Sequence, residues 1–183
     1  MKIKHLLLGI LITASYSSFA QKDITLEDIW ARPTFRQKNI QNLNWSQDGQ
    51  NYLELKDGKI IKYSILDPSK FEVLFDEAIH KTSSGETIRV QEFALSTDER
   101  SILIGTESEQ IYRRSSKENN FLFNRTNNTL KQLSTGGKQM HATLSPDGKR
   151  VAFVRDNNLF WTDVLTGKET AVTTSGKFNF IIK

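Results

Sequence analysis

Residues able to carry out covalent chemistry are scarce in this chain of 183 residues. It has no cysteine, no G-x-S-x-G segment that would present a nucleophilic serine, and no H-E-x-x-H zinc-binding segment. Two histidines follow residue 20, His80 and His141, and neither has the companions that a metal site needs, so we interpret each as a surface or packing residue. Gly136-Gly137-Lys138 lacks the spacing of a phosphate-binding loop. We therefore predict no catalytic residue, no metal site and no cofactor in this chain.

A pair of arginines is the stronger candidate for binding chemistry. Arg113 and Arg114 follow Tyr112 in the polar segment QIYRRSSKENN, residues 110–120. A guanidinium presents its N–H donors in a planar fork that fits a carbonyl or a carboxylate. The pair also fits two solvated charges on an exposed loop, so the residues themselves leave both interpretations open.

The first twenty residues have the layout of a secretory signal peptide. Lys2 and Lys4 precede an apolar stretch, residues 6–14, and Ser18-Phe19-Ala20 places small residues just before a cleavage site after Ala20. The apolar stretch is shorter than the roughly 20 residues of a membrane-spanning helix, which argues against a membrane anchor. We expect export to the periplasm or the extracellular medium, and no membrane association after cleavage.

The charge pattern argues against nucleic acid as a partner. The 25 basic and 21 acidic residues are interspersed rather than gathered into a basic stripe. The absence of cysteine excludes disulfides and lipid attachment at a signal-peptide cysteine, although an exported protein could carry either.

A turn pattern recurs three times along the chain. Its copies are WSQDG, LSTDE and LSPDG, whose serines are Ser46, Ser96 and Ser145, at spacings of 50 and 49 residues. A period of about 40 to 50 residues with several strands in each unit is typical of β-propeller blades. An ordinary β-sandwich with similar turns is the alternative, but near-equal spacings followed by the same strand pattern favour the propeller.

Apolar stretches after each turn supply the expected strands, at residues 52–55, 102–104 and 151–154. In the third unit, two further turns lead to strands at 159–161 and 169–173, which completes a four-stranded blade. We predict an all-β fold, a partial β-propeller of about three four-stranded blades. A closed propeller has about 4 to 8 blades, so we expect these blades to be part of a larger ring.

Three segments are expected in chain order. Residues 1–20 form the signal peptide, residues 21–42 a leader, and residues 43–183 the blades. Thr25-Leu26-Glu27-Asp28 resembles a helix capping box, and Pro33 would end any helix soon afterwards, so the leader should contain a short helix.

The middle unit is longer than the other two. The distance from its serine to the corresponding position of the third strand is 25 residues, against 15 in each of the other units. We expect the roughly ten extra residues, around 110–120, to form a loop on one face, a common place for binding groups.

The segments DITLEDIW, IGTESEQIYRRSSKENNFLFN and HATLSPDGKRVAFVRDNNLFWTDVLTGKETAVT closely resemble the start of bacterial dipeptidyl peptidase IV, in the prolyl oligopeptidase group of serine peptidases. The likeness runs from Asp23 to about Asn179. It implies an exported exopeptidase that releases X-Pro or X-Ala dipeptides. It also implies an eight-bladed propeller joined to a C-terminal α/β-hydrolase domain with a Ser-Asp-His triad, usually in a homodimer.

The resemblance also implies a role for the arginine pair. In the family, an arginine of the second-blade arm contacts the substrate's backbone carbonyl. Arg113 matches that position, and Arg114 matches it if the alignment slips by one. The family's paired glutamates and its triad have no counterpart before Lys183, so we expect an N-terminal fragment that is inactive alone. A non-enzymatic exported binding or scaffold module of the propeller type is the alternative.

Overall fold

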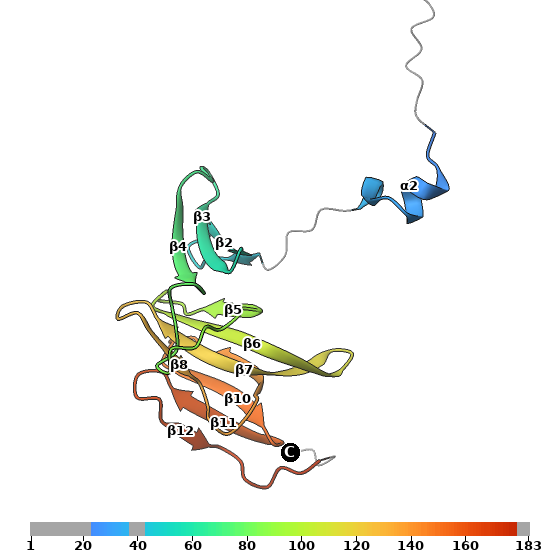
Figure 1. Cartoon of the computed structure of the whole chain (residues 1–183). Helices are drawn as coiled ribbons and strands as arrows, with labels where there is room; N and C mark the ends of the chain where they lie inside the picture. The colour runs from blue at the N-terminus through green and yellow to red at the C-terminus, as the bar shows by residue number, and fades with distance from the viewer. Residues whose placement is uncertain (1–22, 37–42, 179–183) are drawn as a thin grey trace, which may run out of the picture. The chain divides into compact units, whose positions relative to one another are not determined.

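The computed structural model describes residues 23–36 and 43–178 of the chain. The predicted signal peptide, residues 1–20, lies outside these ranges. The chain divides into two units, one ending at Asn39 and the other beginning at Ile40 (Figure 1).

The first unit contains the short helix that the capping box predicts. Helix α2 spans Leu26–Trp30, and a 3-10 helix, η1, spans Pro33–Phe35. The Thr25 hydroxyl accepts a hydrogen bond from the Asp28 backbone N–H at 3.2 Å, and the Asp28 carboxylate accepts one from the Thr25 N–H at 3.3 Å. These reciprocal bonds satisfy two backbone donors that a helix start would otherwise leave free.

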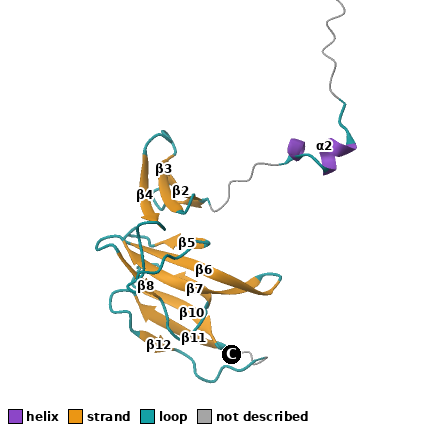
Figure 2. Cartoon of the chain, viewed as in Figure 1, coloured by secondary structure: helices purple, strands orange, loops and turns teal. Residues whose placement is uncertain are grey.

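The second unit consists of three four-stranded antiparallel sheets (Figure 2). The first contains β1 (Asn44–Trp45), β2 (Asn51–Lys56), β3 (Lys59–Ser64) and β4 (Phe71–Asp76). The second contains β5 (Glu92–Leu95), β6 (Ser101–Tyr112), β7 (Ser115–Asn124) and β8 (Thr129–Gln132). The third contains β9 (Met140–Leu144), β10 (Arg150–Arg155), β11 (Asn158–Asp163) and β12 (Glu169–Ala171). Each strand pairs with its neighbours in the chain, as in a propeller blade.

The repeated turns join the first two strands of each sheet. In the second and third sheets, the turn serine donates to the aspartate two residues later, Ser96 to Asp98 at 2.7 Å and Ser145 to Asp147 at 2.6 Å. The same serine oxygens accept backbone N–H bonds that close the turns. This local bonding explains why the Ser-x-Asp pattern marks the second and third sheets. In the first sheet, Asp48 also closes the turn by accepting from the Gln50 and Asn51 N–H groups, but Ser46 donates to Glu99 of the second sheet's turn.

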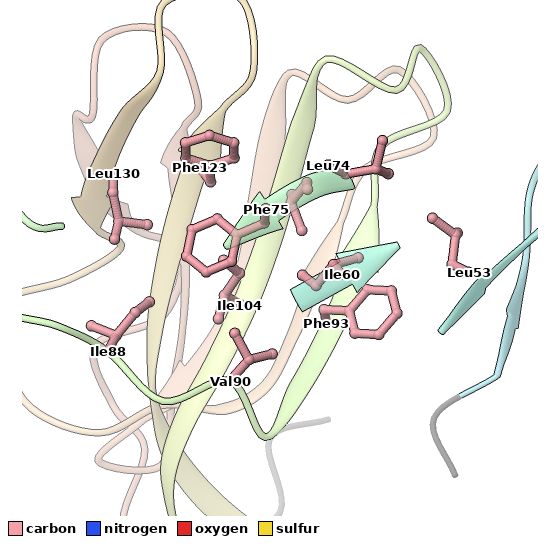
Figure 3. Packing of buried hydrophobic residues seen from close by; sticks show 11 residues of the cluster. Leu53, Ile60, Leu74, Phe75, Ile88, Val90, Phe93, Ile104, Phe123 and Leu130 are labelled. Atoms are coloured by element: carbon pink, nitrogen blue, oxygen red, sulfur yellow. The ribbon is translucent and has the colours of Figure 1, made fainter. Parts of the chain in front are cut away.

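Two separate hydrophobic clusters join the three sheets face to face. Ile60 and Phe75 of the first sheet pack against Phe93 and Ile104 of the second, as Figure 3 shows. The segment between the two sheets adds Ile88 and Val90 to this cluster. The second cluster lies between the second and third sheets and comprises Leu103, Leu122, Leu133, Val151 and Phe153.

This arrangement distinguishes the two folds considered from the sequence. The second sheet contributes to one cluster from one face and to the other cluster from the opposite face, since Ile104 and Leu103 are neighbours on β6. A β-sandwich has one interior shared by two sheets, whereas stacked sheets with a core at each junction are what propeller blades form. The fold is a partial β-propeller, as predicted.

Candidate functional site

The extra residues of the middle unit form a β-hairpin rather than the expected loop. Strands β6 and β7 continue outward as a two-stranded ribbon in which Glu109 pairs with Lys117 and Gln110 with Ser116. We call residues 107–119 the arm. In Figure 1, the ends of β6 and β7 reach beyond the neighbouring strands. The loop prediction was wrong because both faces of the arm are largely polar, which hides the alternation that marks a strand.

Arg113 and Arg114 form the two-residue turn at the tip of the arm. Both side chains are exposed, and so is Tyr112, at 67% of its full area. Within residues 23–36 and 43–178, neither guanidinium has a hydrogen-bond or ion-pair partner. Ten N–H donors are therefore available to an external acceptor, which suits a carbonyl or carboxylate group.

Charged side chains form ion pairs near the end of the arm that joins the sheet. The Glu109 carboxylate lies 3.0 Å from Lys117 Nζ and 3.6 Å from Lys138 Nζ. The hydrogen bond from Lys117, assisted by the charge of Lys138, lowers the pKa of Glu109 below its ordinary value. Glu109 therefore stays ionised, and it ties the arm to the segment that leads into the third sheet.

An acidic cavity of about 80 Å³ lies at the base of the arm. Glu92, Gly105, Glu118 and Ala142 are among the residues that line it. Glu118 Oε2 is buried without a hydrogen-bond partner, and burial, followed by the nearby charge of Glu92, raises the pKa of Glu118. Sequence reasoning missed Glu118, because a glutamate in SSKENN has the appearance of a solvated charge.

The two histidines considered from the sequence, His80 and His141, lie outside the arm. His80 stacks on Phe75 and lies tilted against Phe123, with ring centroids 5.0 and 4.5 Å away, and its Nδ1 accepts a hydrogen bond from the Asp76 N–H at 2.9 Å. His141 is exposed, and the described residues contain no group of three or more His, Cys, Asp or Glu side chains that could hold a metal ion. His80 is thus a packing residue and His141 a surface residue, as interpreted from the sequence.

Lys138, from the Gly-Gly-Lys segment, is directed at the arm. Its Nζ donates to the backbone carbonyl of Glu107 at 2.7 Å. The structure thus brings this lysine close to the arm, whereas the two histidines lie elsewhere.

No helix among the described residues is long and apolar enough to cross a membrane.

Comparisons with known proteins agree with this architecture. A family model described as the dipeptidyl peptidase IV (DPP IV) N-terminal region matches residues 96–182. The crystal structure of Porphyromonas gingivalis dipeptidyl peptidase 4 superposes with a TM-score of 0.73 and 30% identity, over 86% of this chain and 22% of that one.

Two fungal proteins are also similar to this chain. Dipeptidyl aminopeptidase B of Saccharomyces cerevisiae is 26% identical over 129 residues, which are 69% of this chain and 15% of the yeast protein. A probable dipeptidyl-aminopeptidase B of Grosmannia clavigera is 29% identical over 93 residues, 49% of this chain and 10% of that protein. The chain thus spans less than a quarter of the length of each of these three relatives.

Proposed function

We propose that this chain, a DPP IV-like N-terminal region, supplies the substrate-binding arm of an exported dipeptidyl peptidase. In this proposal, Arg113 donates hydrogen bonds to a backbone carbonyl near the N-terminus of the peptide, and Arg114 takes that part if the alignment is offset by one. Cleavage then belongs to an α/β-hydrolase domain in the complete polypeptide, which releases X-Pro or X-Ala dipeptides and forms a homodimer.

One observation carries the proposal: two adjacent guanidinium groups, without partners among the described residues, stand at the end of a projecting hairpin. Most exposed arginines in a folded protein are single solvated charges. Here the fold extends two strands beyond the sheet to hold a two-residue turn that consists entirely of arginine. The neighbouring aromatic ring of Tyr112 adds apolar surface beside these donors, which suits a peptide backbone flanked by side chains.

The test is steady-state kinetics of the complete protein on a Gly-Pro substrate with a chromogenic leaving group. Because a hydrogen bond from a charged donor contributes on the order of 1.5 kcal/mol or more, Arg113→Ala should lower kcat/KM by about tenfold or more. Arg89→Ala is the matched control, since Arg89 is an exposed arginine outside the arm.

The outcomes separate the candidates. A loss in Arg113→Ala but not in Arg89→Ala supports Arg113 as the binding residue. A loss in Arg114→Ala alone transfers that role to Arg114. If both arm variants match the native protein, the arm does not bind this substrate.

A second candidate function is an exported, non-enzymatic scaffold module. The row of Tyr52, Tyr63 and Phe71 on the first sheet favours it. Tyr52 stacks on Tyr63 with ring centroids 5.2 Å apart, Phe71 lies tilted against Tyr63 at 5.9 Å, and Phe71 is 61% exposed. This function predicts a defined oligomer of the 183-residue chain in analytical ultracentrifugation. Monomers or heterogeneous aggregates would contradict it.

A further inference from the structure

The arm lacks lateral support from strands of its own sheet. β5 pairs with residues 102–105 of β6, and β8 pairs with residues 121–124 of β7, so neither strand reaches the arm. A two-stranded ribbon alone is at best marginally stable in water. The direction of its tip must therefore be determined where the arm leaves the sheet.

A β-bulge lies at this point. Glu107 and Ser108 together oppose Glu118, between regular pairs on either side. Glu107 has a φ of 52°, in the left-handed region. A bulge bends its strand, increases the local twist and leaves backbone groups without partners in the ladder.

Two side chains from outside the arm bind these backbone groups. The Ser108 N–H donates to Gln91 Oε1 at 2.7 Å, and the Glu107 carbonyl accepts from Lys138 Nζ at 2.7 Å. Gln91 directly precedes β5, and Lys138 lies between β8 and β9. The bulge is therefore held by the segments that lead into the second and third sheets.

Gln139, the residue after Lys138, holds the backbone of Lys138 in place. Gln139 is fully buried, and its backbone exchanges hydrogen bonds of 2.9 and 2.8 Å with the backbone of Glu118. Gln139 Oε1 also accepts from the backbone N–H and the side-chain amide of Asn120, at 3.0 and 3.2 Å. Lys138 thus extends from a fixed backbone, unlike a lysine on a free loop.

We propose that Gln91 and Lys138 are positioning residues that set the direction of the arm and hence the location of Arg113. They act on the arm and not on a ligand: both bind the backbone of the bulge, and Lys138 also pairs with the Glu109 carboxylate. Their effect on catalysis rests on the proposed function, whereas their effect on the arm's geometry does not.

The geometric part is tested with spin labels. Because the 183 residues include no cysteine, Ser116→Cys in the arm and Lys131→Cys in β8 introduce two unique labelling sites in the 183-residue chain. Electron paramagnetic resonance should give one narrow distance distribution for the native background. Lys138→Met and Gln91→Leu should broaden this distance distribution and shift its maximum. Lys138→Arg should give a distribution close to the native one, and the control Lys168→Met should leave the distribution unchanged. An unaltered distribution in Lys138→Met overturns the proposal.

The catalytic part is tested in the complete protein with a double-mutant cycle. Lys138→Met should raise KM by about threefold to tenfold, the range for losing one charged hydrogen bond that is partly open to solvent, with little change in kcat. In an Arg113→Ala background the same change should add nothing, because Lys138 acts through Arg113. Equal effects in both backgrounds would show a general structural role and overturn the proposal. If Arg113→Ala itself has no effect, the proposed function fails, while the label distances still decide whether Lys138 positions the arm.

Discussion

Glu99 provides the sharpest test of how the first two sheets are joined. It occupies the turn position that is glycine in the other two repeats, and it has the same left-handed backbone, with φ of 55° against 64° at Gly49 and 67° at Gly148. Its carboxylate accepts hydrogen bonds from Ser46 Oγ at 2.7 Å and from Lys62 Nζ at 2.8 and 2.7 Å. In the second repeat, the left-handed backbone of Glu99 is therefore strained, but the Glu99 side chain forms an ion pair with Lys62 of the first sheet.

Three substitutions of Glu99 separate strain from bonding. A left-handed backbone costs a residue with a side chain about 1 kcal/mol, and glycine avoids this cost. The bonds to Ser46 and Lys62 should together contribute about 2 kcal/mol, since these groups are half-buried and partly screened by solvent. Glu99→Ala should therefore lower the free energy of unfolding by about 2 kcal/mol, and Glu99→Gly by only about 1 kcal/mol, because the loss of the ion pair is partly offset by relief of strain. Glu99→Gln keeps the shape without the charge and should fall between the native protein and Glu99→Ala.

Urea unfolding followed by tryptophan fluorescence measures these differences. The pH dependence adds a second check. Burial opposes ionisation of Glu99, but the hydrogen bonds from Lys62 and Ser46 outweigh it and lower the pKa of Glu99. The carboxylate therefore stabilises the fold fully above its ordinary pKa of 4.5, and this stabilisation is lost as pH falls through the lowered folded value. The difference in the free energy of unfolding between the native protein and Glu99→Gln should therefore disappear in acid. If Glu99→Gly is less stable than Glu99→Ala, or if this difference is independent of pH, the reasoning is refuted.

Two further predictions concern the cavity and the first core cluster. Glu118→Gln should stabilise the protein at neutral pH and have little effect below pH 4.5. The pKa of Glu118 is raised in the folded protein, so the native carboxyl destabilises the fold progressively as pH rises from the ordinary pKa of 4.5 through the folded pKa. Denaturant titrations of both proteins at several pH values check this, and a constant difference would contradict it. Phe123→Ala should lower the free energy of unfolding by about 3 to 5 kcal/mol, because the ring is 1% exposed and packs edge-on against Phe75 at 5.1 Å. A loss below about 1 kcal/mol in urea unfolding would mean that the site collapses around the missing ring.

The fold was largely predictable because its signals are local. Ser96 and Ser145 bond within their own turns, so each turn can be recognised from five residues without knowledge of the rest of the fold. The capping box at Thr25 is local in the same way. Apolar stretches after each turn then placed the second strand of each sheet. The clearest is residues 102–104 of β6, which are buried on both faces because the second sheet packs against a neighbour on each side.

The candidate site was only partly predictable because its determinants are distant in sequence. Arg113 and Arg114 could be singled out as neighbours, but their support depends on Gln91, 17 residues before Ser108, and on Lys138, 31 residues after Glu107. A single sequence contains no sign of such pairs. The arm itself was misassigned because strands without a buried face have the composition of a loop.

The length of the arm has a consequence for precision. Residues 107–112 rise about 3.3 Å each, so the tip stands about 20 Å from the bulge. At this radius a rotation of only about 10° at the base sweeps the guanidinium groups through about 3.5 Å, more than the length of a hydrogen bond. The position of the guanidinium groups is therefore determined by the rigidity of the bulge at the base of the arm, and not by contacts near the arginines.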